Sequence, residues 1–96
     1  MSDHERRYVK SEDFLSRRVG DTVALIPGAA GSDLSDIYTL TPVGAAVWAQ
    51  IDGETTVGEI AAGIADTFGI SNETAQKDVD AFVRQLRRIH AIQVVA

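Results

Sequence analysis

The chain has 96 residues, no cysteine and a formal net charge of −5, because 14 acidic residues outnumber 9 lysines and arginines. This length predicts a single domain. The lack of cysteine excludes a disulfide framework, a zinc–thiolate site, an iron–sulfur cluster and a thiol nucleophile. The acidic balance disfavours binding to a phosphate backbone, so we expect no nucleic acid partner.

Nothing in the sequence predicts export or membrane insertion. The apolar share of 45% is typical of a globular chain. No apolar run approaches the ~18 residues of a membrane span. The first ten residues, MSDHERRYVK, lack the apolar core of a secretory signal. We therefore expect a cytoplasmic protein that does not bind a membrane.

The first half of the chain predicts strands. Residues 1–13 are polar and predict a flexible N-terminal arm ahead of a folded domain at 14–96. Strand-like runs at 14–19 and 22–26 flank Gly20-Asp21, a turn signal that predicts a hairpin. Residues 27–36 have the Gly, Ala, Ser and Asp composition of a loop. Residues 37–40 then predict a third short strand.

Three helices are expected after these strands, and each has a clear start. Thr41 is an N-cap candidate, followed by Pro42 at the first helical position. Thr56 and Glu59 have the spacing of a capping box. Ser71 is positioned to cap the third helix. The short links between the helices predict that they pack as close neighbours.

The apolar residues predict how the helices face the core. The third helix carries a stripe with i+3 and i+4 spacing, formed by Ala75, Val79, Phe82, Leu86 and Ile89. We expect Trp48, Phe68 and Phe82 in the middle of the core. Residues 91–95 predict a closing strand or an extended tail. The chain therefore predicts an α+β fold, with an N-terminal three-stranded antiparallel sheet followed by three helices.

No group of residues predicts catalysis. His4 and His90 have no partner at metal-ligand spacing, the glycines at 28–31 lack the lysine of a phosphate loop, and the serines lack a nucleophile context. We expect no catalytic residue, no metal and no cofactor. Arg84, Arg87 and Arg88 have two interpretations. They complement the dipole at the end of the third helix, or they contact an anion or an acidic peptide.

Three parts of the chain together resemble the PqqD family. Residues 38–48 (YTLTPVGAAVW) resemble the segment that opens its first helix. Residues 51–60 (IDGETTVGEI) resemble its LxDGxxTVxEI link into the second helix, and residues 68–70 and 78–86 resemble its final helix. The resemblance covers roughly residues 14–92. Its specificity comes from the order and spacing of the pieces, because a single capped amphipathic helix is common.

The resemblance implies a recognition element for ribosomally synthesised and post-translationally modified peptides (RiPPs), with a winged helix-turn-helix-like fold. Such a peptide chaperone binds the leader region of a precursor peptide. The leader adds as a strand beside the third strand and lies against the third helix. A tailoring enzyme, such as a radical SAM protein or a leader peptidase, then acts on the core peptide. The loop at 27–36 looks longer than the family's turn, which leaves the limits of the groove open.

Strand addition predicts a groove between the third strand and one flank of the third helix. We expect the flank with Val83 and Arg87, because it combines an apolar side chain with charges of both signs. A core position for Val83, and the opposite flank with Gln85 and Arg88, stay open as alternatives. The predicted peptide-binding residues are Asp36, Ile37, Tyr38, Thr39, Leu40, Gln76, Asp80, Val83, Arg84 and Arg87.

Two other functions stay open at this stage. A winged-helix nucleic-acid binder would use the basic residues of the third helix, and its affinity would fall steeply with salt. A protein–protein adaptor would bind its partner enzyme with no precursor peptide present. A homodimer through the exposed edge strand is a further alternative.

Overall fold

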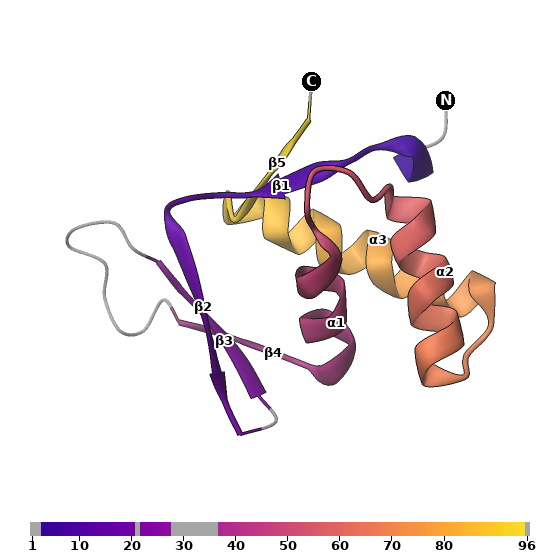
Figure 1. The fold of residues 1–96 in the computed structure, drawn as a ribbon, viewed down its shortest axis with the longest axis horizontal. Helices are drawn as coiled ribbons and strands as arrows, with labels where there is room; N and C mark the ends of the chain where they lie inside the picture. Colours follow the sequence, from indigo (N-terminus) through magenta and orange to yellow (C-terminus); the bar gives the residue numbers. More distant parts are fainter. Residues whose placement is uncertain (1–2, 21, 28–36, 96) are drawn as a thin grey trace.

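The computed structural model describes residues 3–20, 22–27 and 37–95, which form an α+β fold with two antiparallel sheets and three helices (Figure 1). The helices pack against one another, and the β2–β3 hairpin lies beside α1, on the side away from α2. The elements are η1 (Asp3–Glu5), β1 (Tyr8–Lys10), β2 (Phe14–Val19), β3 (Thr22–Pro27), β4 (Tyr38–Leu40), α1 (Pro42–Gln50), α2 (Val57–Phe68), α3 (Asn72–Arg88) and β5 (Ile92–Val94).

The larger sheet has the strand order β2-β3-β4, and it contains the three predicted strands. Val23 pairs with Leu40 and Leu25 pairs with Tyr38. Val23, Leu25 and Leu40 are buried, so one face of this sheet covers the core. Pro27 belongs to β3, and the rest of the predicted loop, residues 28–36, lies outside the described residues.

A second sheet corrects the prediction of a single N-terminal sheet. Strand β1 pairs antiparallel with β5, with Tyr8 opposite Val94. The segment predicted as an arm therefore contributes a strand, and the Tyr8 side chain, which is only 4% exposed, joins the core. Residues 92–94 form the closing strand, one of the two alternatives for the C-terminal segment. Sequence periodicity did not predict this sheet, because its strands come from opposite ends of the chain.

The helix starts follow the predicted capping pattern. The Thr41 hydroxyl accepts a hydrogen bond from the Gly44 amide at 3.0 Å, and the Ser71 hydroxyl accepts one from Thr74 at 3.1 Å. Thr56 and Glu59 form the complete capping box. Helix α1 ends at Gln50, and Ile51 in extended conformation is its C-cap.

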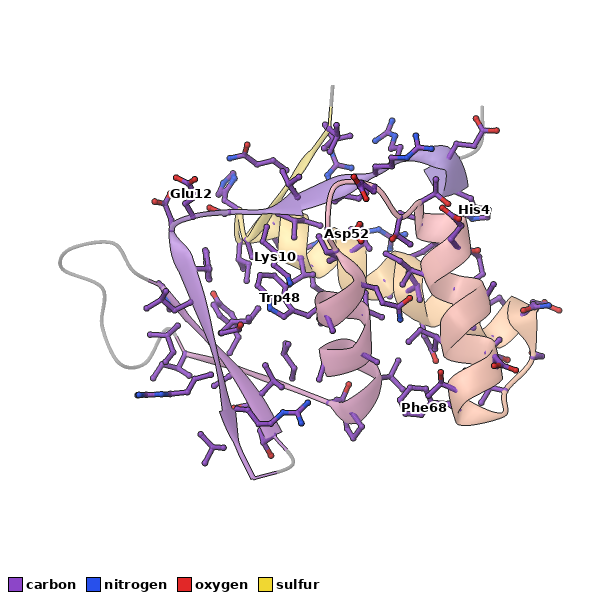
Figure 2. All side chains as sticks on the ribbon, in the orientation of Figure 1. His4, Lys10, Glu12, Trp48, Asp52 and Phe68 are labelled. Atoms are coloured by element: carbon purple, nitrogen blue, oxygen red, sulfur yellow. The ribbon has the colours of Figure 1, made fainter. Side chains whose placement is uncertain are left out.

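The core differs from the sequence prediction at two aromatic residues. Trp48 is 4% exposed, as expected, whereas Phe68 at the end of α2 is 38% exposed (Figure 2). Phe82 is only partly buried. Val83 is 7% exposed and takes the core position on α3 that the prediction gave to Phe82. The buried side of α3 is formed by Ala75, Val79, Val83 and Leu86.

The described part of the chain contains neither a membrane-spanning helix nor a metal-binding cluster. None of its helices is long and apolar enough to span a bilayer. Within the same residues, no three His, Asp or Glu side chains gather in a way that would hold a metal ion.

Candidate functional site

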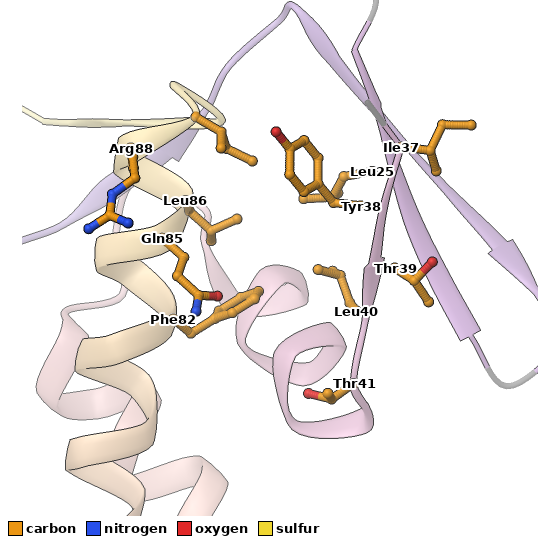
Figure 3. A pocket seen from close by; sticks show the side chains of 11 residues that line it. Leu25, Ile37, Tyr38, Thr39, Leu40, Thr41, Phe82, Gln85, Leu86 and Arg88 are labelled. Carbon is orange, nitrogen blue, oxygen red and sulfur yellow. The ribbon is translucent and has the colours of Figure 1, made fainter. Parts of the chain in front are cut away.

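A hollow of about 470 Å³ lies between β4 and α3 (Figure 3). Strand β4 forms one wall and the C-terminal half of α3 forms the other. Leu25 of β3, which is fully buried, also lines it. The lining residues are Leu25, Ile37, Tyr38, Thr39, Leu40, Thr41, Phe82, Gln85, Leu86, Arg88 and Ile89.

Strand β4 borders this hollow as an edge strand. It pairs with β3 on one side, and no described strand pairs with its other side. In an antiparallel sheet, alternate residues of an edge strand direct their N–H and C=O groups outward. The outer edge of β4 therefore offers backbone donors and acceptors to a further strand.

Apolar side chains line the interior of the hollow. Figure 3 shows Tyr38 and Leu40 directed from β4 towards α3, while Ile37 and Thr39 point to the other face of the sheet. Leu40 is 8% exposed and Tyr38 is 39% exposed, so the hollow deepens from Tyr38 towards Leu40. This alternation follows from the pleat, which directs successive side chains to opposite faces.

Helix α3 contributes Phe82 to this lining because α1 leaves room for its ring. A Cβ atom at Gly44 would lie 3.1 Å from the Phe82 ring, so a glycine at this position of α1 permits the close approach. The ring packs on α1 and keeps one side towards the hollow. The aromatic residue that the sequence placed in the middle of the core thus forms part of the groove wall.

One cationic and several polar side chains lie at the margin of the hollow. Among its described lining residues, Arg88 is the only charged one. Gln85, one turn earlier on α3, is directed towards the hollow beside Phe82, whereas the Arg88 guanidinium extends along the outer side of the helix (Figure 3). The hollow therefore combines an apolar interior with a cationic end near the last turn of the helix.

The α3 residues predicted to line the groove lie elsewhere on the helix. The Gln76 amide donates to Asp80 at 3.0 Å, and Asp80 lies 3.6 Å from His4 of η1. The Arg87 guanidinium lies 5.9 Å from the centre of the Tyr8 ring. Val83 is buried. This flank is thus occupied by the N-terminal segment, and the hollow is lined by the flank with Gln85 and Arg88.

Some of the other predicted site residues line the hollow and some do not. Ile37, Tyr38, Thr39 and Leu40, four of the residues predicted to bind the peptide, line the hollow. Arg84 is exposed and does not line it, and Asp36 lies outside the described residues. Sequence reasoning missed Leu25 and Thr41, and it kept the α3 flank with Gln85 and Arg88 only as the alternative. The i+3 and i+4 stripe contained Phe82, Leu86 and Ile89, but all three were assigned to the core.

The two clear pKa shifts belong to structural turns. Hydrogen bonds from the Thr55 and Glu54 amides lower the pKa of Asp52, which precedes α2. Hydrogen bonds from the Thr56 amide and hydroxyl lower the pKa of Glu59 in the capping box. These carboxylates stabilise the start of α2, and neither lines the hollow. The perturbed groups therefore do not point to acid–base chemistry.

The same fold occurs in a solved structure described as TbiB1 in complex with the TbiA(beta) leader peptide. The match has a TM-score of 0.76 and 22% sequence identity, and it covers 92% of this chain and 98% of that chain. Both proteins therefore share one small α+β fold over nearly their whole length.

The family model described as "Coenzyme PQQ synthesis protein D (PqqD)" matches residues 20–92. This match covers most of the chain, so the protein belongs to the PqqD family. The resemblance found in the helix-capping segments is thereby confirmed. A comparison with curated proteins found no match.

Proposed function

We propose that this protein binds the leader region of a ribosomally synthesised precursor peptide by strand addition at β4 and presents it to a modifying enzyme. One observation carries the proposal: the open edge of β4 faces the partly apolar flank of α3 across a hollow of about 470 Å³. An extended peptide matches this shape, because it needs one row of backbone partners and space for alternate side chains.

The short length of β4 determines where affinity comes from. Three residues provide few ladder hydrogen bonds, and each contributes only about 0.5–1.5 kcal/mol after competition with water. A Leu or Phe side chain that enters the hollow would contribute about 1.5–3 kcal/mol by burial. The leader should therefore carry a large apolar residue that enters between Leu40 and Phe82, flanked by residues in extended conformation.

The charge at the margin suggests a second element of recognition. Arg88 is exposed at the end of α3, where an acidic leader residue would approach it from the open hollow. We therefore assign peptide contact to Gln85 and Arg88, in place of the flank with Asp80 and Arg87. The four residues 37–40 keep their predicted role as the strand that receives the peptide.

The comparisons support this function. The protein belongs to the PqqD family, and the solved structure with the same fold is described as a complex with a leader peptide. On this proposal the protein performs no chemistry and needs no cofactor. Its second partner is the tailoring enzyme, such as a radical SAM protein or a leader peptidase, and both partners would meet it in the cytoplasm.

An amide chemical-shift titration tests the proposal, using a leader peptide from a precursor encoded beside this protein. We expect shifts at residues 37–40 and at 82–89. Proline substituted in the peptide at a ladder position should weaken binding, because it removes a backbone donor. If no shifts occur at high peptide concentration, strand addition is refuted and the adaptor function is favoured.

Two neighbouring arginines provide matched variants for the position of the groove. Arg88→Glu and Arg87→Glu change the charge equally on the last turn of α3, but only Arg88 lines the hollow. For an acidic leader, Arg88→Glu should weaken affinity roughly three- to tenfold, while Arg87→Glu changes it less than about twofold. If Arg87→Glu weakened affinity more than Arg88→Glu, the peptide would bind along the flank with Asp80 and Val83.

A further inference from the structure

The second edge of the larger sheet has an unusual charge for an acidic protein. Strand β2 forms this edge, and no described strand pairs with its outer side. A hollow of about 380 Å³ lies beside it, against α1 and β1. Three of its eight lining residues are cationic, namely Lys10, Arg17 and Arg18, and none is acidic. This edge lies across the sheet from β4, so it is separate from the proposed leader groove.

The strand register places the charges on defined faces. Arg18 pairs with Val23 and Ser16 pairs with Leu25, and both partners are buried. Cross-strand partners share a face, so Ser16 and Arg18 lie on the side that faces α1. The same alternation places Leu15, Arg17 and Val19 on the opposite face, where Leu15 and Val19 are 63% and 66% exposed.

The cations beside β2 are not neutralised within the described structure. Neither Lys10, Arg17 nor Arg18 has a carboxylate oxygen within ion-pair distance among the described residues. The Lys10 ammonium lies 5.3 Å from the centre of the Trp48 ring, which lines the same hollow (Figure 2). Glu12 follows Lys10 in the turn before β2, but it does not line the hollow.

We propose that the β2 edge binds an extended acidic segment of a partner protein, which adds as a strand to the larger sheet. The alternation of side chains along β2 determines which residues the partner segment must carry on each face. Its carboxylates would face Arg18 and Lys10, and on the other face its apolar residues would cover Leu15 and Val19, on either side of Arg17. This segment would bind at the edge opposite to the leader groove, so the two ligands would not compete.

A second copy of this chain fits the edge poorly. In a register centred on residues 17 and 18, antiparallel pairing of two β2 strands would bring the Arg17-Arg18 pair of one copy beside that of the other. Like charges in opposing or adjacent cross-strand positions are destabilising. The charge of β2 therefore selects against self-association and favours an acidic partner.

The probe for this site is a capped peptide of alternating Glu and Val, and the control is its Gln and Val counterpart. Trp48 is the only tryptophan of the protein, so its fluorescence reports on this hollow. We expect a fluorescence change on titration, and amide shifts at Lys10 and residues 14–19 but not at 38–40. Three results would overturn the proposal. The two peptides could bind with equal affinity, the amide shifts could occur at residues 38–40 instead, or a DNA duplex could bind more tightly at these cations.

Single substitutions separate this site from the leader groove. Arg18→Gln and Lys10→Gln should each weaken binding of the acidic peptide roughly two- to fivefold, and Arg88→Gln should leave it unchanged. Dispersed amide spectra would establish that each variant is folded. A leader titration of the Arg18→Gln variant should still shift residues 37–40. Loss of the shifts at residues 37–40 would count against the proposed leader function. Unchanged binding of the acidic peptide by both Arg18→Gln and Lys10→Gln would refute the β2 site.

Discussion

Replacing Val83 with Ala tests the division of α3 between core and groove. The substitution removes both γ-methyl groups from a side chain that is only 7% exposed. At about 0.8 kcal/mol for each buried carbon group, their transfer to water accounts for about 1.6 kcal/mol. The cavity left behind increases the expected loss in unfolding free energy to roughly 2–3 kcal/mol. For a domain of this size, that loss lowers the melting temperature by roughly 8–20 °C.

Urea denaturation followed by circular dichroism measures this loss directly. Arg84→Ala is the matched control, because Arg84 is the next residue on α3 and is exposed. Its unfolding free energy should change by less than about 0.5 kcal/mol. A Val83→Ala protein with near wild-type stability would show that this side chain is not part of the core.

The same variant also separates stability from binding. Below its melting temperature, Val83→Ala should bind the leader peptide within about twofold of the wild-type affinity, because the side chain does not line the hollow. Phe82→Ala should weaken leader binding more strongly, since Phe82 does line it. A large loss of affinity in Val83→Ala with little change in Phe82→Ala would refute the proposed orientation of α3.

Two further predictions concern the connections around α2. Gly53→Ala should lower the melting temperature more than Gly69→Ala. Both glycines have positive φ, but a Cβ at Gly53 would lie 2.7 Å from a Val9 methyl group, whereas a Cβ at Gly69 meets nothing within 4 Å. Equal losses in thermal melts would contradict this steric argument. The second prediction concerns acid unfolding. Folding lowers the pKa of Glu59 below its ordinary 4.5, so its contribution to stability is present above that pH and is lost as the pH falls through the lowered value. Glu59→Gln should make the loss of stability below about pH 4.5 shallower in urea titrations, and an unchanged slope would refute the assignment.

Local sequence predicted the features that depend on neighbouring residues. The Thr41 and Ser71 caps and the Thr56–Glu59 capping box connect groups three residues apart. The hairpin between β2 and β3 depends on a turn of the same local kind. Such interactions can be predicted from spacing, because the backbone geometry of a turn or a helix start brings these groups together in any context.

The second sheet and the composition of the core could not be predicted in this way. Tyr8 lies in a polar segment, and its burial depends on pairing with Val94 near the other end of the chain. Phe68 ends α2 at an exposed position, although its residue type favours the core. Residue type gives only an average burial, and the position of each helix relative to its neighbours decides the actual value.

The amino-acid pattern was sufficient to predict the helices, their caps, the larger sheet and the resemblance to the PqqD family. The flank of α3 that faces β4 depends on how the whole domain packs. The apolar pattern of α3 is compatible with either flank, because Phe82 and Val83 are adjacent and both apolar. The N-terminal segment breaks this ambiguity: Tyr8 lies beside Arg87 and His4 lies beside Asp80, so that flank is covered and the flank with Gln85 and Arg88 borders the hollow. These contacts join residues far apart in the sequence, and their formation depends on the packing of the whole domain.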